Sequence, residues 1–243
     1  MGLQISDVPA AILAGGLATR LGGLTGGRPK ALVDVAGRPF VDHQLDLLRR
    51  HGIRRVVFCV GHFGDQIEAH LGSGADRGLS IGYVHDGDQL RGTAGAIRRA
   101  LPLLGERFWV MYGDSYMDID YAAVLAAFER RGRPALMTVI RNDDRWDRSN
   151  AEFRDGRLLA YDKRHPTADM RHIDYGVALL EREVVETRVP ADVPHDLADL
   201  YQQLVADGTM TGYEVTERFY EIGSPAGLEE TRQYLIDRSG ARS

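Results

Sequence analysis

Short apolar runs alternate with amphipathic segments along the first 140 residues of the chain. The apolar runs have the length of buried strands and cover residues 8–14, 55–60, 79–84, 108–112 and 135–140, and the run 55–60 is rich in β-branched residues. The amphipathic segments carry apolar residues at helical spacing and predict helices over 40–51, 65–71, 93–104 and 121–131. Because strands that alternate with helices form parallel sheets, we expect an α/β three-layer sandwich with helices on both faces of the sheet.

The alternation changes after residue 140. Asp155-Gly156 lies between the short apolar runs 151–153 and 158–161, which is the pattern of a β-hairpin. Further strands are predicted over 173–180, 210–215 and 219–222, and further helices over 197–206 and 226–235. We expect residues 141–180 to form a small antiparallel insertion on the mostly parallel mixed sheet. No repeat, low-complexity tract or linker interrupts the sequence, which predicts a single domain over residues 1–243.

The composition is that of an ordinary globular protein, because 44% of the 243 residues are hydrophobic and 27% are charged. The net charge of -5 argues against a dedicated nucleic-acid binder, and no apolar run approaches the ~20 residues that a membrane span needs. Cys59 is the only cysteine, which excludes a disulfide framework within the chain and a cysteine-based zinc cluster. We expect a cytoplasmic protein without nucleic-acid or membrane partners. A homo-oligomer is compatible with the sequence, which does not determine the oligomeric state.

The loop after the first predicted strand lacks the common nucleotide-binding fingerprints. Residues 15–20 read G-G-L-A-T-R, which is not the G-x-G-x-x-G of dinucleotide-binding folds, and no Walker A sequence follows. H-E-x-x-H and G-x-S-x-G are also absent from the sequence. These absences argue against dehydrogenases, P-loop ATPases, zinc proteases and serine hydrolases.

The same loop nevertheless has the parts of a phosphate-binding site. Gly15 and Gly16 allow backbone N–H groups to approach an anion closely, while Arg20 and Lys30 supply positive charge at the two ends. Pro29 restricts the backbone just before Lys30. Of the 30 lysine and arginine residues, only Lys30 and Lys163 are lysines, so these two compact point charges are candidates for a specific role.

Six short segments, taken together, resemble the signature of the sugar-1-phosphate nucleotidylyltransferases. The resemblance covers residues 10–235, and the six segments follow the order of the family's motifs. They are the loop 13–32, G-T-A-G-A at 92–96, G-D at 113–114, D-K at 162–163, Y-G-V at 175–177 and Y-E-I-G-S-P at 220–225. Ala18 stands where the family usually has glycine, Asp162 replaces a glutamate, and Glu221 replaces an aspartate. The resemblance implies a Rossmann-like fold and the transfer of a nucleotidyl group to a sugar 1-phosphate.

The implied reaction joins a nucleoside triphosphate to a sugar 1-phosphate and releases pyrophosphate. The attacking phosphate oxygen is already anionic near pH 7, because the second pKa of a phosphate monoester is about 6. A general base is therefore not required, whereas cations and positioning are needed to bring two anions together. Asp114 follows the strand predicted over 108–112, at the edge where open α/β sheets bind ligands, and its hard oxygen atoms suit Mg²⁺.

The resemblance also implies roles for individual residues. Arg20, Lys30 and Asp114 would be catalytic, with Asp114 and Glu221 as ligands of the Mg²⁺ cofactor. The nucleotide would contact the backbone at two segments and the side chain of one glutamine: Ala14, Gly15, Gly16, Thr93, Ala94, Gly95 and Gln89. The sugar phosphate would bind Lys163, Asp174 and Gly176. Trp146 is expected to pack or to anchor its loop, with a lid over the sugar as the alternative.

Two other functions remain open at this point. Asp118-Ile119-Asp120 is the D-x-D of many glycosyltransferases, although its place before a helix makes Asp120 a candidate N-cap. A regulator that binds nucleotide sugars without turnover is the second alternative. Within the preferred reaction, G-T-A-G-A favours GTP with a hexose or heptose 1-phosphate, and UTP, CTP, dTTP and ATP stay open. By the same resemblance, the product would enter the synthesis of cell-surface polysaccharide or of glycosylated metabolites.

Overall fold

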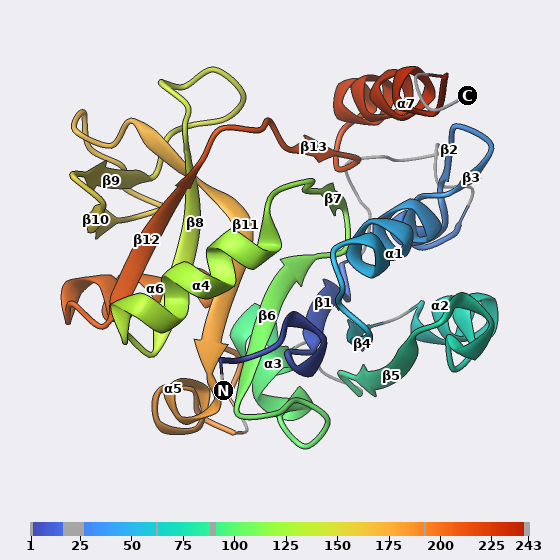
Figure 1. Cartoon of the computed structure of the whole chain (residues 1–243), viewed down its shortest axis with the longest axis horizontal. Helices are drawn as coiled ribbons and strands as arrows, with labels where there is room; N and C mark the ends of the chain where they lie inside the picture. Colours follow the sequence, from blue (N-terminus) through green and yellow to red (C-terminus); the bar gives the residue numbers. More distant parts are fainter. Residues whose placement is uncertain (1, 17–26, 62, 88–90, 192, 241–243) are drawn as a thin grey trace.

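The computed structural model describes residues 2–16, 27–61, 63–87, 91–191 and 193–240. The central feature of these residues is a nine-stranded mixed sheet with the path β10-β9-β11-β6-β1-β4-β5, in which β8 also pairs with β11 and β12 (Figure 1). The strands are β1 (Ala10–Ala14), β4 (Arg55–Val60), β5 (Ser80–His85), β6 (Arg107–Tyr112), β8 (Ala135–Arg141), β9 (Ala151–Arg154), β10 (Arg157–Tyr161), β11 (His172–Glu181) and β12 (Met210–Val215).

Helices cover both faces of this sheet, as the sequence predicts. The first face packs against α1 (Phe40–Arg50), α2 (Gly64–Leu71) and α4 (Tyr121–Arg131). The second face packs against α3 (Gly92–Ala100), α5 (Arg182–Arg188) and α6 (Leu197–Ala206). Ile12 and Phe58 belong to the first layer of the core and Ala11 and Val57 to the second, because successive residues of a strand point to opposite faces.

The N-terminal half of the sheet is parallel. β1 pairs in parallel with β4 and β6, and β4 pairs in parallel with β5, so four carboxyl ends meet at one edge. Residues 15–16 follow β1, Asp86 follows β5 and Gly113-Asp114 follows β6 at that edge. The predicted phosphate loop and the predicted metal ligand are thereby neighbours in space.

The antiparallel part of the chain is more than an attachment to the sheet. The predicted hairpin forms β9 and β10, with Asp155 and Gly156 both at positive φ (52° and 75°), as a tight two-residue turn requires. β11, however, lies inside the sheet between β6 and β8 and is antiparallel to both. The mostly parallel sheet expected from the sequence therefore contains one long antiparallel strand near its centre.

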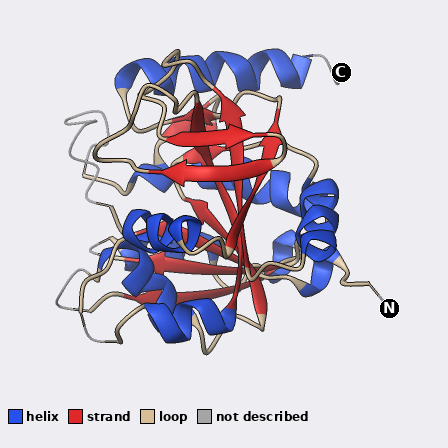
Figure 2. Ribbon diagram, turned by 90° about the vertical axis from the view of Figure 1, so that its left-hand side faces the viewer, coloured by secondary structure: helices blue, strands red, loops and turns tan. Residues whose placement is uncertain are grey.

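Other differences from the expected elements are local. The helix predicted over 93–104 ends at Ala100, and Pro102 lies in the turn that follows. The last helix, α7 (Pro225–Gly240), is longer than predicted and lies at the top of the molecule in both views (Figures 1 and 2). α5, the small sheet of β2 (Asp34–Val35) with β3 (Arg38–Pro39), and β7 (Ser115–Tyr116) had no clear sequence pattern. The strand predicted over 219–222 forms β13 (Tyr220–Glu221), which pairs with β7 in a second small sheet. No helix among the described residues is long and apolar enough to cross a bilayer.

Candidate active site

A cavity of about 260 Å³ opens at the carboxyl ends of β1, β4, β5 and β6. Gly15, Gly16 and Thr93, which the sequence assigned to the nucleotide, line it. Asp86 and Asp196 add two carboxylates to a wall that is otherwise mainly apolar. We call this the first cavity. Ala14 is not part of its lining, although it directly precedes Gly15.

Gly15 is held by a close approach to a second glycine, Gly61, at the end of β4. A Cβ at Gly61 would lie 2.7 Å from the carbonyl oxygen of Gly15. A Cβ at Gly15 would lie 3.3 Å from Oδ2 of Asp86, whereas a Cβ at Gly16 would meet nothing within 4 Å. The loop is thus supported by backbone packing at Gly15 and open at Gly16, where a ligand can approach.

The start of α3 is partly covered by the segment before α6. The N–H groups of Ala94 and Gly95 donate hydrogen bonds to the carbonyl oxygen of His195 (2.9 and 3.1 Å). These two predicted nucleotide residues are buried and do not line the first cavity. Thr93 does line it, and its Oγ1 accepts a hydrogen bond from the N–H of Leu197 (2.7 Å). Of the three predicted nucleotide residues at this helix start, only Thr93 lines the first cavity.

Asp86 is a candidate binding residue that the sequence reasoning missed. Only 7% of the surface of Asp86 is exposed. Its carboxylate forms no hydrogen bond or ion pair with any of the described residues. Burial raises the pKa of this carboxyl group, while the positive charges of Arg99 and Arg91 act in the opposite direction. The available sequence signal was an acidic residue directly after a strand that ends at the ligand-binding edge.

Cys59 also lines the first cavity, but its chemistry is that of a packed thiol. Burial raises the pKa of the thiol to about 12, so it stays protonated at neutral pH. Its Sγ donates a weak hydrogen bond to the carbonyl oxygen of Ala96 (3.7 Å). Cys59 is therefore excluded as a nucleophile.

A second cavity of about 320 Å³ brings together the predicted metal and sugar-phosphate residues. Its lining includes all five of them: Asp114, Lys163, Asp174, Gly176 and Glu221. Tyr112, at the end of β6, lines both cavities and so marks their boundary. Burial raises the pKa of the Tyr112 hydroxyl, which keeps it protonated as a hydrogen-bond donor. This residue, too, was missed from the sequence, where it reads only as the end of an apolar strand.

Asp174 and Gly176 form one wall of the second cavity. Gly176 has a positive φ of 96°, and a Cβ there would lie 3.3 Å from the Tyr112 ring. The Gly176 N–H donates a hydrogen bond to Asp174 (2.9 Å). Burial raises the pKa of Asp174, and that hydrogen bond and the charge of Lys163 oppose the shift. Lys163 is exposed and has no hydrogen bond or ion pair within the described ranges, so its ammonium is available to a ligand.

Lys30 is paired with Asp114, which lines the second cavity. Pro29 holds extended backbone (φ −61°, ψ 148°), after which Lys30 begins a short 3-10 turn, Lys30–Leu32. Lys30 Nζ lies 3.2 Å from Asp114 Oδ2, and Ser115 Oγ donates to Asp114 Oδ1 at 3.3 Å. This arrangement places a cation next to a carboxylate of the second cavity.

Glu221 lies beside Asp114 because the strand predicted over 219–222 pairs with β7, a partner that the sequence did not predict. Glu221 pairs with Ser115 in β13–β7, and the N–H of Ile222 donates to the carbonyl oxygen of Asp114 (2.9 Å). The Glu221 carboxylate accepts hydrogen bonds from the Gly223 N–H and from Ser224 Oγ at the start of α7. Both carboxylates are thus close to one another, and Glu221 also stabilises the turn into α7.

Trp146 packs against its neighbours, as the sequence predicts, and it also lines the second cavity. Its ring makes an edge contact with Phe219 at 5.8 Å, and Phe219 makes another with Tyr175 at 5.7 Å. The guanidinium of Arg218 lies 5.5 Å from the Trp146 ring. The outer wall of the second cavity is therefore aromatic, a surface suited to the apolar face of a sugar ring.

The D-x-D residues have structural partners. Asp118 binds the His51 ring at 2.8 Å and also pairs with Arg50 and Arg238. Asp120 caps α4 by accepting a hydrogen bond from the Ala123 N–H (2.9 Å), as the sequence predicts. Two other predicted residues, Arg20 and Gln89, lie outside the residues that the structure describes.

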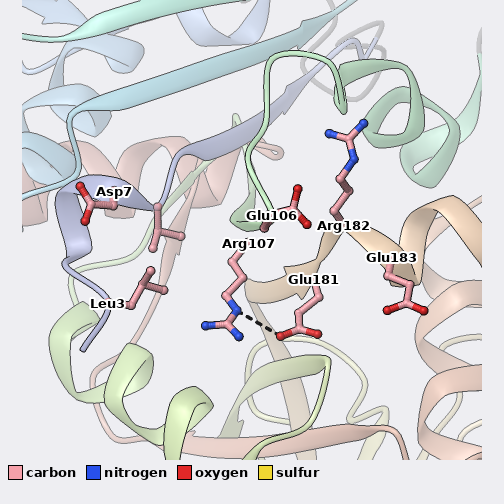
Figure 3. Close-up of a pocket in the computed structure, with 8 residues that line it drawn as sticks. Leu3, Asp7, Glu106, Arg107, Glu181, Arg182 and Glu183 are labelled. Atoms are coloured by element: carbon pink, nitrogen blue, oxygen red, sulfur yellow. Dashed lines mark hydrogen bonds and ion pairs between the residues drawn. The ribbon is translucent and has the colours of Figure 1, made fainter. Parts of the chain in front are cut away.

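A further cavity of about 420 Å³ is unsuited to this chemistry (Figure 3). Its lining includes the Arg107–Glu181 ion pair (3.1 Å) and the carboxylates of Asp7, Glu106 and Glu183. Arg107 begins β6, so this cavity lies at the opposite end of the strand from Tyr112. Ligands of open α/β sheets bind at the carboxyl ends of the strands, which favours the first and second cavities.

Comparison with known proteins agrees with the motifs. The model of the nucleotidyl transferase family matches residues 9–150. The chain is 29% identical over 230 residues to N-acetylmuramate alpha-1-phosphate uridylyltransferase of Caulobacter vibrioides, covering 89% of this chain and 92% of that protein. It is 30% identical over 225 residues to mannose-1-phosphate guanylyltransferase of Mycobacterium tuberculosis, covering 90% of this chain and 62% of that longer protein.

A solved structure supports the fold. The inositol-1-phosphate CTP transferase from T. maritima superposes with a TM-score of 0.78 at 23% identity, covering 95% of this chain and 97% of that one. The Rossmann-like three-layer architecture expected from the sequence is confirmed, and so is the resemblance to the sugar-1-phosphate nucleotidylyltransferases. The chain therefore belongs to the nucleotidyl transferase family of enzymes.

Proposed function

We propose that this enzyme couples a nucleoside triphosphate to a sugar 1-phosphate. A phosphate oxygen of the sugar 1-phosphate attacks the α-phosphorus, a new P–O bond forms, and the bond to the β-phosphate oxygen breaks to release pyrophosphate. The observation that carries this proposal is the Lys30–Asp114 pair beside two cavities that share Tyr112. Two adjoining cavities, one of them lined by a carboxylate that is paired with a lysine, suit a reaction that joins two phosphorylated substrates.

Each substrate would bind in one of the two cavities. The nucleotide would enter the first cavity, with its phosphates over Gly15 and Gly16 and beside Lys30. The sugar phosphate would enter the second cavity, where Lys163 faces its phosphate and Asp174 accepts a hydrogen bond from a hydroxyl group. Lys30 would neutralise negative charge as pyrophosphate leaves, and Arg20 would add to it. Catalysis would rest on positioning and charge, with no covalent intermediate.

The carboxylates beside Lys30 fit a hard divalent cation. Mg²⁺ is commonly bound by one or two carboxylates together with substrate phosphates and waters, and Asp114 and Glu221 supply such a pair. Among the described residues no group of three or more metal-ligating side chains occurs, which suits a cation that the phosphates help to hold. Asp114 would be the main ligand, because both Glu221 oxygens accept hydrogen bonds at the start of α7. When bound, Mg²⁺ would offset the charge of the phosphates.

Asp86 would contact the base of the nucleotide and so favour one nucleoside triphosphate over another. A carboxylate accepts hydrogen bonds, and guanine offers two neighbouring N–H donors on one edge, whereas uracil offers one N–H between two carbonyl oxygens. An ionised Asp86 in the first cavity thus supports the GTP preference with a hexose or heptose 1-phosphate that the G-T-A-G-A segment suggested. The Caulobacter relative is named a uridylyltransferase, which makes UTP the second nucleotide to test.

Pyrophosphate release with Mg²⁺, measured for five nucleoside triphosphates against a panel of sugar 1-phosphates, tests the proposal. We expect release from one nucleotide only when its matching sugar 1-phosphate is present. A glycosyltransferase would instead consume a nucleotide sugar without forming pyrophosphate. Nucleotide binding with no release from any pair would contradict the proposed reaction and favour the regulatory alternative.

A further inference from the structure

A cavity of about 410 Å³ between α3 and α5 is lined by arginine from three segments of the chain. Arg98 and Arg99 come from the last turn of α3, Arg182 begins α5, and Arg91 precedes α3. Glu186 is the only carboxylate among the described residues that line it. We call this the α3–α5 cavity. Such a concentration of positive charge is unusual in a chain whose net charge is -5.

The arginines of this cavity differ in how firmly they are held. Arg182 is fixed, because its Nε donates to Glu186 (2.8 Å) and its Nη1 donates to the carbonyl oxygen of Leu101 (2.8 Å). Its side chain extends away from the Arg107–Glu181 pair of the neighbouring cavity (Figure 3). Arg98 and Arg99, by contrast, have no hydrogen bond or ion pair with any described residue. The cavity therefore combines one anchored guanidinium with two that can adjust to a ligand.

Helix-dipole effects explain only part of this arrangement. Basic residues are favourable in the last turn of any helix, and α4 likewise ends in Arg130 and Arg131. Neither arginine of α4 lines any of the cavities named above, and Arg131 donates to Thr211 Oγ1 (2.9 Å). At α3 the terminal arginines converge with Arg182 from a different helix, and like charges that share a cavity repel one another unless an anion lies between them.

We propose that the α3–α5 cavity binds a small molecule that carries a diphosphate group. Guanidinium groups present forked donors that match phosphate oxygens in pairs, and several arginines from different directions can engage both phosphates of a diphosphate. Leu101 and Pro102 add an apolar wall for the remainder of such a molecule. This site is separate from the two substrate cavities and goes beyond the proposed reaction.

The location of the site gives it a means of influencing nucleotide binding. α3 has nine residues, so its ends are only about 13 Å apart. Thr93, at its start, lines the first cavity, and Arg98 and Arg99, at its end, line the α3–α5 cavity. The charges of Arg99 and Arg91 also oppose the rise in the pKa of Asp86 that burial causes. An anion bound to these arginines would therefore influence the first cavity in two ways. It would contact the end of α3, whose start lines that cavity, and it would offset the positive charges that act on Asp86.

Hydrogen exchange with inorganic pyrophosphate as the probe, without divalent metal, tests the site. We expect pyrophosphate to protect amides in the segments 96–104 and 182–188, and isothermal titration to detect the same binding. Arg98→Gln/Arg99→Gln should weaken this binding at least tenfold and abolish the protection. The matched control Arg130→Gln removes a terminal helix arginine elsewhere and should change neither result. Lys30→Gln, in the substrate site, should leave the protection in place.

A second arm with ADP separates the possible sources of the diphosphate. Equal protection by pyrophosphate and ADP would mean that the diphosphate alone is recognised, and stronger protection by ADP would mean that the apolar wall contributes. Both results support the site. Protection by neither probe, or a folded double variant that binds pyrophosphate as tightly and with the same protection as the natural chain, would overturn it.

Discussion

The ammonium of Lys30 lies 3.2 Å from a carboxylate oxygen of Asp114, although 84 residues separate the two in the chain. Both side chains are partly buried, with 16% and 28% of their surface exposed. Lys30 begins a short 3-10 turn, and Asp114 follows β6 at its carboxyl end. The pair offsets both charges, and under the proposed function incoming phosphates would compete with Asp114 for Lys30.

Asp114→Asn should remove most of the turnover and leave the fold intact. The amide keeps the shape of the side chain but loses the charge that a cation needs, and we expect kcat to fall by about 10²–10³-fold, the cost typical of losing one electrostatic stabiliser. Pyrophosphate release measures the loss, and circular dichroism checks the fold. Asp120→Asn is the control, because asparagine is an equally good N-cap and activity should be unchanged. Near-normal turnover in Asp114→Asn would refute its assignment as a ligand.

Asp86→Asn should alter the choice of base. Asparagine offers one acceptor and two donors in place of two acceptors, so kcat/KM for GTP should fall relative to that for UTP by at least about tenfold, or 1.4 kcal/mol. The measurement is the ratio of the two kcat/KM values with one sugar 1-phosphate. An unchanged ratio would mean that Asp86 does not contact the base. Asp76→Asn, at an exposed 3-10 turn, is a control for a general loss of charge.

The same substitution should stabilise the protein at neutral pH. Burial raises the pKa of Asp86 above its ordinary value of 3.8, so the folded state holds its proton to a higher pH than the unfolded state. The free energy of unfolding therefore falls as pH rises from about 3.8 through the raised pKa. Asp86→Asn removes this loss. Its Tm should exceed that of the natural chain at pH 7 and approach it below pH 3.8; a lower Tm at pH 7 would contradict the buried, unpartnered charge.

Gly61→Ala should destabilise the fold, whereas Gly16→Ala should not. The new methyl group at Gly61 would lie 2.7 Å from the backbone oxygen of Gly15, and the backbone must move to relieve the overlap. We expect a loss of about 1–3 kcal/mol in denaturant unfolding, as for other overpacked sites. At Gly16 there is nothing within 4 Å, so stability should change by less than about 0.5 kcal/mol. Equal stability of the two variants would argue against the close approach of the two loops.

Lys163→Gln should weaken the binding of the sugar phosphate without affecting the nucleotide. Lys163 lines the second cavity and not the first, and its ammonium is exposed. We expect KM for the sugar 1-phosphate to rise by about tenfold, in keeping with a charged hydrogen bond, while the Kd of the nucleotide stays constant. Direct nucleotide titration and steady-state kinetics separate the two effects. Arg164→Gln is the neighbouring control, since Arg164 is already paired with Asp199.

The sequence alone determined the elements whose pattern is local. The strand predicted over 55–60 and the helices predicted over 121–131 and 197–206 have the bounds of β4, α4 and α6. The Asp155-Gly156 turn and the Asp120 cap were also readable, because such features depend on residues a few positions apart. The sequence also predicted the metal and sugar-phosphate residues that line one cavity, namely Asp114, Lys163, Asp174, Gly176 and Glu221.

The tertiary structure decided which of these groups can meet a ligand. It covers the N–H groups of Ala94 and Gly95 with His195, a residue about 100 positions away, and leaves Thr93 open. It places β11 between β6 and β8, and it brings Asp86 and Tyr112 into the cavities. No local pattern encodes these outcomes, because they depend on which distant segments pack together once the sheet has formed. Local propensity thus predicted the elements of this protein, and long-range packing selected the side chains of its site.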